Sequence, residues 1–246
     1  ICGLFSRIFP NNIIYCSRKS INFHVKYHFY KNDKTKLIYN GYNFNKFFPS
    51  KNHRLNFRKK YKIKKTDIIL GYAGRFAKQK NIVSMLSGFS KISKDNKNIY
   101  LYMVGQGINN NNKKLKSLIN QLELNNRIFL LDHKKNLLEF YNGIDLLLLV
   151  SHSESFSNVI AESMLCSTPV LSSNAGCSKK IVEKNGFVIN KNDDANIARN
   201  LNKSLSVINN QSDKWKILKK NSRSYIKNSF SIKKMADSYS NLWNFK

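Results

Sequence analysis

The stretch that decides the fold is DLLLLVSHSESFSNVIAESMLCSTPVLSS, residues 145–173. Residues 145–151 form an almost continuous apolar run, which is typical of a strand buried on both faces of a sheet. Residues 158–167 follow with helical character, and residues 169–173 form a second short apolar run. A strand, a helix and a strand in so short a stretch predict a β-α-β unit with parallel strands.

The same alternation continues on both sides of this unit. Strands are predicted at residues 67–74, 98–107, 127–132 and 186–190, and helices at 81–92, 113–124, 136–144 and 178–185, with further helices to the end. Regular alternation with apolar strands predicts an α/β fold: a Rossmann-like parallel sheet with helices on both faces. Before it, residues 11–17 and 36–40 are predicted as short strands with a helix over 20–30 between them.

The composition favours a folded, strongly basic protein. Its formal net charge is +29, and 41% of its residues are hydrophobic, which is enough for a sizeable core. Most lysines are dispersed and indicate a solvated surface. The densest basic cluster, residues 51–65, contains aromatic residues and is interpreted as a linker facing an anionic membrane or a substrate.

The apolar runs and the cysteines indicate where the protein resides. The longest apolar run, residues 144–150, is far shorter than the ~20 residues of a membrane-spanning helix. The four cysteines form no Cys-x-x-Cys pair, which favours reduced thiols. We therefore expect a cytoplasmic protein, with peripheral attachment to the inner face of the membrane as one alternative.

Two cations follow the strand at 67–74. Gly74 ends this strand, Arg75 comes next, and Lys80 lies near the start of the following helix. Ligands of parallel sheets bind beyond the carboxyl ends of the strands, so two cations beside helix N–H groups predict a diphosphate site. The alternative is that both are ordinary surface charges of a basic protein.

Two acids follow the strand at 145–151. Glu154 lies in the loop, and Glu162 lies about one turn inside the next helix, which Ser157 or Asn158 can cap. A carboxylate near a helix N-terminus is favourable by ~0.3–1 kcal/mol, which accounts for Glu162 but not for Glu154. Because carboxylates accept hydrogen bonds from vicinal hydroxyls, two of them beside a diphosphate site predict clamps for two sugars.

These motifs together resemble a known family. The segments LIYNGYNFNKFFP, AGRFAKQKN, YLYMVGQG and SHSESFSNVIAESMLCSTPVLSS are similar to family four of the nucleotide-sugar glycosyltransferases, which are retaining enzymes with the two-domain GT-B fold. The resemblance implies that Glu162 holds the ribose, that Glu154 lies at the donor sugar, and that Arg75 and Lys80 neutralise the diphosphate. Backbone N–H groups of residues 156–158 would face the sugar and the diphosphate.

The resemblance also implies a base site near Asp132 and His133, although the family often has Gly where Asp132 stands. The implied catalytic residues are Arg75, Lys80 and Glu154. The implied donor site comprises Gly74, Arg75, Lys80, Asp132, His133, Glu154, Phe156, Ser157, Asn158, Val159 and Glu162.

The resemblance divides the chain into four parts. Residues 1–48 resemble the tail of an acceptor domain, 49–66 a basic linker, 67–228 the nucleotide-sugar-binding domain, and 229–246 a helix that crosses back. Because the family's acceptor domain is normally much longer, we expect this chain by itself to bind a donor without transferring it.

The resulting functional prediction is part of a retaining hexosyltransferase. It would use a UDP- or GDP-linked sugar and a cell-surface polysaccharide or lipid-linked saccharide acceptor, as in lipopolysaccharide or capsule synthesis. No Asp-x-Asp motif appears, so no metal or other cofactor is expected. The alternatives are an inactive nucleotide-binding remnant and a basic nucleic-acid-binding module. Nucleic acid is disfavoured as a partner, because glutamates in the cleft would repel phosphodiesters.

Overall fold

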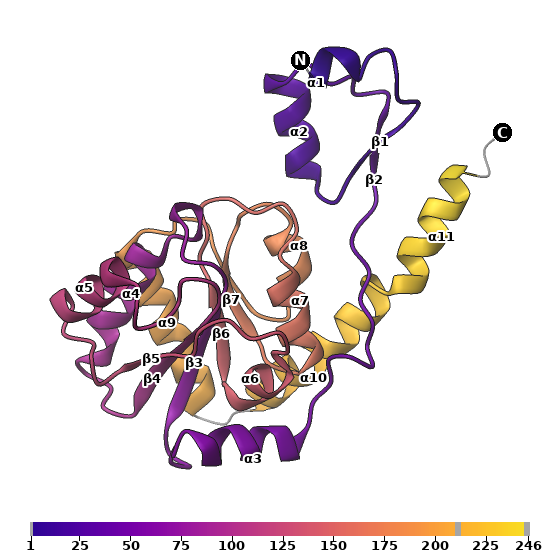
Figure 1. The fold of residues 1–246 in the computed structure, drawn as a ribbon. Coiled ribbons are helices and arrows are strands. Elements are labelled where there is room, and N and C mark those ends of the chain that lie inside the picture. Colours follow the sequence, from indigo (N-terminus) through magenta and orange to yellow (C-terminus); the bar gives the residue numbers. More distant parts are fainter. Residues whose placement is uncertain (1, 210–212, 244–246) are drawn as a thin grey trace.

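The structure, a computed structural model, describes residues 2–209 and 213–243. Figure 1 shows a large α/β domain and a small N-terminal unit beside it. The last helix leaves the large domain and runs towards the small unit. Residues 1, 210–212 and 244–246, which fall within the predicted ranges 1–48, 67–228 and 229–246, lie outside the described residues.

The large domain is built on a six-stranded sheet. The order is β5-β4-β3-β6-β7-β8, and every neighbouring pair is parallel. The strands are β3 (Ile68–Ala73), β4 (Ile99–Val104), β5 (Ile128–Leu130), β6 (Leu146–Leu149), β7 (Val170–Ser173) and β8 (Phe187–Ile189). All residues of β3 and β6 are buried, which confirms the parallel sheet predicted from their apolar runs. The strand order reverses between β3 and β6, where such sheets bind ligands.

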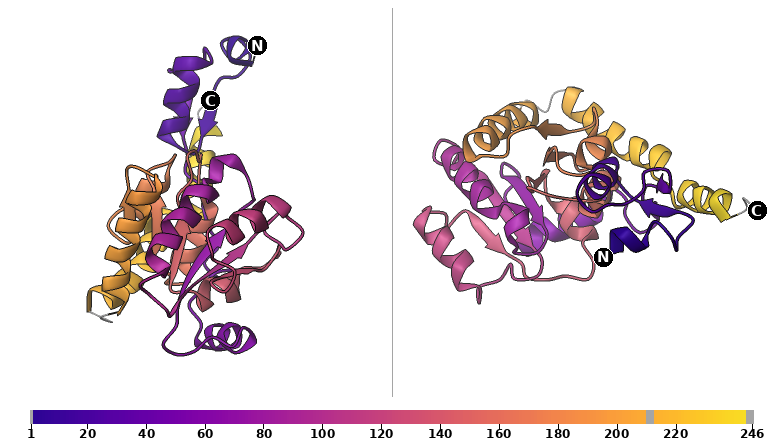
Figure 2. Two further views of the ribbon diagram at one scale, coloured as in Figure 1. Left: turned by 90° about the vertical axis from the view of Figure 1, so that its left-hand side faces the viewer. Right: turned by 90° about the horizontal axis from the view of Figure 1, so that it is seen from above.

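Helices cover both faces of the sheet (Figure 2). They are η1, a 3-10 helix (Lys78–Lys80), α4 (Ile82–Ser93), α5 (Lys113–Gln121), α6 (Leu138–Gly143), α7 (Asn158–Leu165), α8 (Ser178–Val182), α9 (Asp194–Asn209) and α10 (Asp213–Ser229). Helix α4 packs against α9, and α7 packs against α10. Within the described ranges, no helix combines the length and the apolar character needed to cross a bilayer.

The small unit contains α1 (Cys2–Phe5), β1 (Ile13–Tyr15), α2 (Arg18–Tyr27) and β2 (Thr35–Leu37). Strands β1 and β2 pair in parallel, and Ser17 caps α2 by accepting a hydrogen bond from the Ser20 N–H. Both strands and α2 were predicted, whereas α1 was not.

The chain passes twice between the small unit and the large domain. The first passage follows β2, and the second connects α10 to α11 (Ile232–Trp243). They touch where the Tyr42 N–H donates to the Phe230 carbonyl at 2.9 Å, and Tyr42 also forms a β-bridge with Ser231. Helix α11, which lies in the predicted crossing segment 229–246, then runs towards the small unit (Figure 1).

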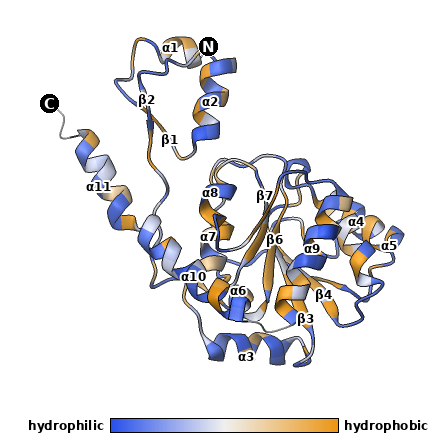
Figure 3. Cartoon of the chain, turned by 180° about the vertical axis from the view of Figure 1, so that it is seen from behind, coloured by the Kyte–Doolittle hydropathy of each residue, from blue (hydrophilic) through white to orange (hydrophobic). Residues whose placement is uncertain are grey.

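The basic stretch 51–65 is not only a linker, because most of it forms helix α3 (Lys51–Lys60). Ser50 caps the helix by accepting the His53 N–H, and Phe57 is buried with its ring 6.1 Å from that of Phe140 in α6. Figure 3 shows that α3 is largely hydrophilic apart from such contacts. The linker prediction was therefore wrong for residues 51–60, since charge composition concealed a capped helix with one apolar anchor.

Candidate active site

The predicted cations follow the carboxyl end of β3, and the two predicted acids follow the carboxyl end of β6, Glu154 in the loop and Glu162 in helix α7. These two strands are hydrogen-bonded neighbours, so the loops that follow them lie side by side. Gly74 and Arg75 follow β3, and Glu154 lies in the loop after β6. The His152 N–H donates to the Gln79 carbonyl at 2.8 Å and ties the two loops together.

Lys80 and Glu154 form a close ion pair. Lys80 Nζ lies 2.5 Å from Glu154 Oε1, and the Ser151 hydroxyl donates to the same oxygen at 2.7 Å. The two charged side chains are only 17% and 10% exposed, so water screens their attraction weakly. The other oxygen of Glu154 has no hydrogen-bond partner among the described residues, which leaves one acceptor for a ligand.

Glu162 is held by a neighbouring helix. Its Oε2 accepts a hydrogen bond from the hydroxyl of Tyr141 in α6 at 2.8 Å. Burial raises the pKa of Glu162, while the Tyr141 hydrogen bond and the charge of Lys46 lower it. Because side chains tilt towards the N-terminus of their helix, the carboxylate of Glu162 leans towards the start of α7.

The N-terminus of α7 lacks a side-chain cap. Ser157 occupies the N-cap position without a capping hydrogen bond, and its hydroxyl lies 3.2 Å from that of Ser178 instead. Asn158 Oδ1 accepts a hydrogen bond from the Tyr42 hydroxyl at 2.8 Å. The first N–H groups of a helix attract anions when no side chain satisfies them. This end of α7 therefore suits a phosphate or a sugar oxygen.

The loop after β3 is shaped by a close backbone contact. Gly105 has φ +143°, and a side chain there would overlap the Gly74 carbonyl. The Tyr72 hydroxyl donates to the Arg75 carbonyl at 3.0 Å. The pKa of buried Tyr72 is raised by desolvation and by Glu154 and is lowered by Arg75, so both charges lie near its hydroxyl. The exposed Arg75 side chain makes no hydrogen bond or ion pair within the described ranges.

Asp132 and His133 lie at the same edge but further along it, after β5. Asp132 has φ +58°, a left-handed conformation that explains why a glycine suits this position. Its Oδ1 accepts hydrogen bonds from Asn109 Nδ2 at 3.1 Å and from the His133 N–H at 2.7 Å, which lower its pKa. Within the part of the chain that the structure describes, neither residue bonds or pairs with the four charged residues above.

Two of the predicted donor-site residues use their side chains for packing. The Phe156 ring lies 6.1 Å from Tyr42 and 5.8 Å from Phe230, at the place where the chain passes between its two parts. Val159 packs against the hydrophobic core. For Phe156, only the backbone N–H remains available for the predicted role.

Sequence reasoning missed the partners that orient the two glutamates. Tyr141 precedes Glu162 by more than five helical turns of sequence, so no local spacing pairs them, and Ser151 was read only as the end of a strand. In residues 2–209 and 213–243, no three His, Cys, Asp or Glu side chains gather as a metal site would require. The prediction of a metal-free site remains a prediction.

Comparisons with known proteins identify the family. The family model described as "Glycosyl transferases group 1" matches residues 53–225. The capsular polysaccharide biosynthesis glycosyltransferase CapM of Staphylococcus aureus is 28% identical over 207 residues, which cover 83% of this chain and 53% of CapM. The O-antigen biosynthesis glycosyltransferase WclY of Escherichia coli is 28% identical over 167 residues, which cover 68% of this chain and 44% of WclY. The chain spans about half the length of these curated relatives.

Solved structures show the same fold. Anabaena Alr3699/HepE in complex with UDP and glucose matches with a TM-score of 0.88 at 21% identity, over 99% of this chain and 66% of HepE. WaaG, a glycosyltransferase involved in lipopolysaccharide biosynthesis, matches with a TM-score of 0.80 at 18% identity, over 95% of this chain and 62% of WaaG. The chain therefore belongs to the group 1 glycosyltransferases and has their GT-B type of α/β fold.

Proposed function

We propose that the carboxyl edge of β3 and β6 binds a nucleoside-diphosphate sugar, and that the protein transfers this sugar with retention to a saccharide acceptor. The observation that carries the proposal is the Lys80–Glu154 pair beside the uncapped start of α7, with Glu162 one turn deeper. Cations, free helix N–H groups and two carboxylates are what a diphosphate between two sugars requires.

Different residues of the proposed site contact different parts of the nucleotide sugar. Arg75, Lys80 and the first N–H groups of α7 hold the diphosphate. Glu154 accepts a hydrogen bond from a hydroxyl of the donor sugar with its unpartnered oxygen, while Lys80 remains between it and the phosphates. Glu162, oriented by Tyr141, accepts from the ribose hydroxyls, and Asp132 and His133 lie along the same edge for the base.

The reaction needs stabilisation of the leaving group more than a protein base. The bond from the sugar C1 to the β-phosphate oxygen breaks, and a bond from C1 to the acceptor oxygen forms on the same face. The leaving phosphate oxygen takes the proton of the acceptor hydroxyl, so charge and atoms balance without another reactant. Arg75 and Lys80 stabilise the charge on the departing diphosphate, and such preorganised charge is usually the largest catalytic contribution. The proposal needs neither a metal nor another cofactor.

The relatives favour the donor and the acceptor class. HepE was solved with UDP and glucose and with UDP-glucose, which favours a UDP-linked hexose over a GDP-linked one. CapM and WclY carry the names of capsule and O-antigen synthesis, which favours a cell-surface polysaccharide or a lipid-linked saccharide as acceptor.

A lipid-linked acceptor would bring the protein to the inner face of the membrane. The exposed lysines of the basic stretch, including Lys59 and Lys60 of α3, are the groups that would meet anionic headgroups at ~1 kcal/mol each. Arg54 and Arg58 contribute less, because both already face Asp145. Flotation with neutral and with anionic vesicles tests this attachment, and equal binding to both would refute it.

Calorimetric titration of UDP and GDP, beside initial transfer rates with the matching sugar nucleotides, tests the site. Glu162→Gln should weaken nucleotide binding, because the ribose is present in the free nucleotide. Glu154→Gln should reduce transfer and leave nucleotide binding nearly unchanged, because free UDP has no donor sugar. Glu139→Gln, an exposed acid on α6, is the control and should change neither.

Three outcomes are informative. The opposite pattern would exchange the roles of the two glutamates. Nucleotide binding without transfer in the longest available form of the protein would support the nucleotide-binding remnant instead. If no substitution alters binding or rate, the assignment of the donor site to this edge of the sheet is wrong.

A further inference from the structure

A cavity lies at the opposite end of the sheet from the proposed donor site. It has a volume of about 420 Å³ and is lined by α3, the end of α6, the segment before β7, and α10. Asp145 and Thr168 both precede their strands, β6 and β7, so this cavity opens at the amino ends of the strands. The donor site lies at the carboxyl ends, and the two sites share no residue.

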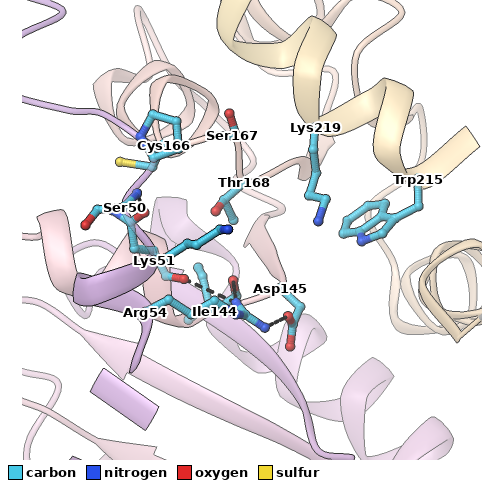
Figure 4. Close-up of a pocket in the computed structure, with 12 residues that line it drawn as sticks. Ser50, Lys51, Arg54, Ile144, Asp145, Cys166, Ser167, Thr168, Trp215 and Lys219 are labelled. Atoms are coloured by element: carbon cyan, nitrogen blue, oxygen red, sulfur yellow. Dashed lines mark hydrogen bonds and ion pairs between the residues drawn. The ribbon is translucent and has the colours of Figure 1, made fainter. Parts of the chain in front are cut away.

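Three cations face this cavity. Figure 4 shows the Lys51 side chain extending across it towards Lys219, whose ammonium group lies beside Trp215, with the guanidinium of Arg54 beside Asp145. Trp215 stands next to Lys219, whose Nζ lies 5.9 Å from the centre of the indole ring. The arrangement combines two exposed ammonium groups, one guanidinium held by hydrogen bonds and the side chain of Trp215.

Among the described residues that line the cavity, Asp145 is the only one with a carboxylate, and its oxygens already have partners. Asp145 Oδ1 lies 2.6 Å from Arg54, and its Oδ2 lies 3.6 Å from Arg58. The same Oδ2 accepts the Ile69 N–H at 2.8 Å. Lys51 and Lys219 have no hydrogen bond or ion pair among the described residues, so the cavity carries unbalanced positive charge.

Lys219 lies in a positively charged, partly desolvated environment. Partial desolvation and the charge of Arg54 lower the pKa of Lys219, and only Asp145 opposes them. A bound anion between Lys219 and Lys51 would reverse this effect. Arg54 is also fixed by its hydrogen bonds to the carbonyls of Asn142 and Ile144, both at 3.2 Å, so its charge stays at the cavity wall.

We infer that this cavity is a second anion site that binds a phosphate dianion between Lys51 and Lys219, beside the wall that Arg54 forms. A dianion matches two lysines without carboxylate partners, and arginine and lysine are the usual phosphate ligands. The phosphate can belong to a free phosphomonoester or to the headgroup of a phosphomonoester lipid, and the experiment separates the two. The inference is independent of the proposed donor site.

Trp215 supplies a direct readout. The chain has two tryptophans, so Trp243→Phe leaves Trp215, at the cavity wall, as the sole reporter. Titration of this variant with inorganic phosphate should change its emission saturably, beyond the change with sodium chloride at equal ionic strength. Lys51→Met and Lys219→Met, each in this background, should weaken phosphate binding at least tenfold.

Two controls identify the site. Lys216→Met changes an exposed lysine next to Trp215 that pairs with Asp213, and it should leave phosphate affinity unchanged. Lys80→Ala should also leave it unchanged, because Lys80 lies at the donor site. Equal affinity in the parent, Lys51→Met and Lys219→Met variants, or loss of binding in Lys80→Ala, would overturn the inference.

The source of the phosphate is tested with vesicles. If the natural ligand is a lipid, vesicles containing phosphatidic acid should bind in a way that depends on Lys51 and Lys219, and phosphatidylserine vesicles of equal charge should bind less tightly. If free phosphate saturates the emission change and the vesicles show no such dependence, the ligand is a free phosphomonoester. The absence of saturable binding with both probes would refute the site.

Discussion

The two ends of the parallel sheet hold ion pairs of nearly equal length in different surroundings. At the amino end, Arg54 lies 2.6 Å from Asp145, and at the carboxyl end, Lys80 lies 2.5 Å from Glu154. Both oxygens of Asp145 accept hydrogen bonds, one from Arg54 of α3 and the other from the Ile69 N–H of β3. These bonds join α3 and β3 to the start of β6. Glu154 keeps one oxygen without a partner among the described residues. The two carboxylates therefore differ: that of Asp145 is saturated and anchors a helix, whereas that of Glu154 can still accept a hydrogen bond from a ligand.

The largest expected effect concerns the carboxyl end. Lys80→Ala in an active form of the protein should lower turnover about 10²–10³-fold. The substitution removes one preorganised positive charge that would stabilise the leaving diphosphate. Arg75→Ala should act in the same direction. Initial rates at saturating donor measure this loss. Lys78→Ala, an exposed lysine of the same 3-10 helix, should change the rate less than about twofold, since surface substitutions away from such sites have small effects. An equal loss in Lys78→Ala would show that general charge, not the pair, is responsible.

At the amino end, the expected effect is on stability. Asp145→Asn should lower the free energy of unfolding by about 3 kcal/mol, because it leaves two arginines beside a largely buried position without their partner. Urea unfolding at constant m-value measures this loss, and UDP affinity of the folded protein should not change. The control is Asp213→Asn, whose side chain is 89% exposed and which should cost less than about 0.5 kcal/mol. If Asp145→Asn lowered UDP affinity without lowering stability, Asp145 would act in ligand binding and not in anchoring α3.

A smaller effect should depend on pH. The hydrogen bond from Tyr141 lowers the pKa of Glu162, which burial raises above the ordinary value of 4.5. The bond therefore contributes stability while Glu162 is ionised, and this contribution is lost as the pH falls through the Glu162 pKa. Tyr141→Phe should cost about 1.5 kcal/mol at neutral or higher pH and less in acid, as measured by urea unfolding across that range. In a Glu162→Gln background, the cost of Tyr141→Phe should not depend on pH through this group, and a persistent dependence would assign the effect to another residue.

The smallest effect should come from the contact between the two parts of the chain. Tyr42→Phe removes the hydrogen bond to Asn158 Oδ1 and should lower the free energy of unfolding by about 1 kcal/mol. Thermal and urea unfolding measure the change. Tyr39→Phe, in the same passage but without a hydroxyl hydrogen bond among the described residues, should be nearly neutral. Equal costs for the two variants would mean that ring packing, not the hydrogen bond, joins α7 to this passage.

The sheet and the placing of the candidate residues at its carboxyl edge were predictable because both follow from local patterns. Apolar runs such as Leu146–Leu149 admit one interpretation as buried strands, and parallel topology then places Arg75, Lys80, Glu154 and Glu162 at one edge. The orienting contacts were not predictable, because Tyr141 meets Glu162 only through the packing of α6 on α7. Helix α3 did have local signals, namely the cap Ser50 and basic residues in its last turn, which favour a helix C-terminus. The interpretation of this stretch as a linker relied on its high density of basic residues and not on these signals.

The joint between the two parts has a mechanical consequence. An added Cβ at Gly41 would lie 2.6 Å from the Ile232 Cα and 2.7 Å from the Ser231 carbonyl oxygen, so the two passages touch backbone to backbone. The Tyr42 hydrogen bond to Phe230 joins the two passages at this same point. The passages should therefore move together and not slide past each other. The Tyr42 hydroxyl also donates to Asn158 Oδ1, so this joint is connected to the start of α7. A movement of the small unit would therefore be transmitted first to the start of α7, where we propose that the diphosphate binds.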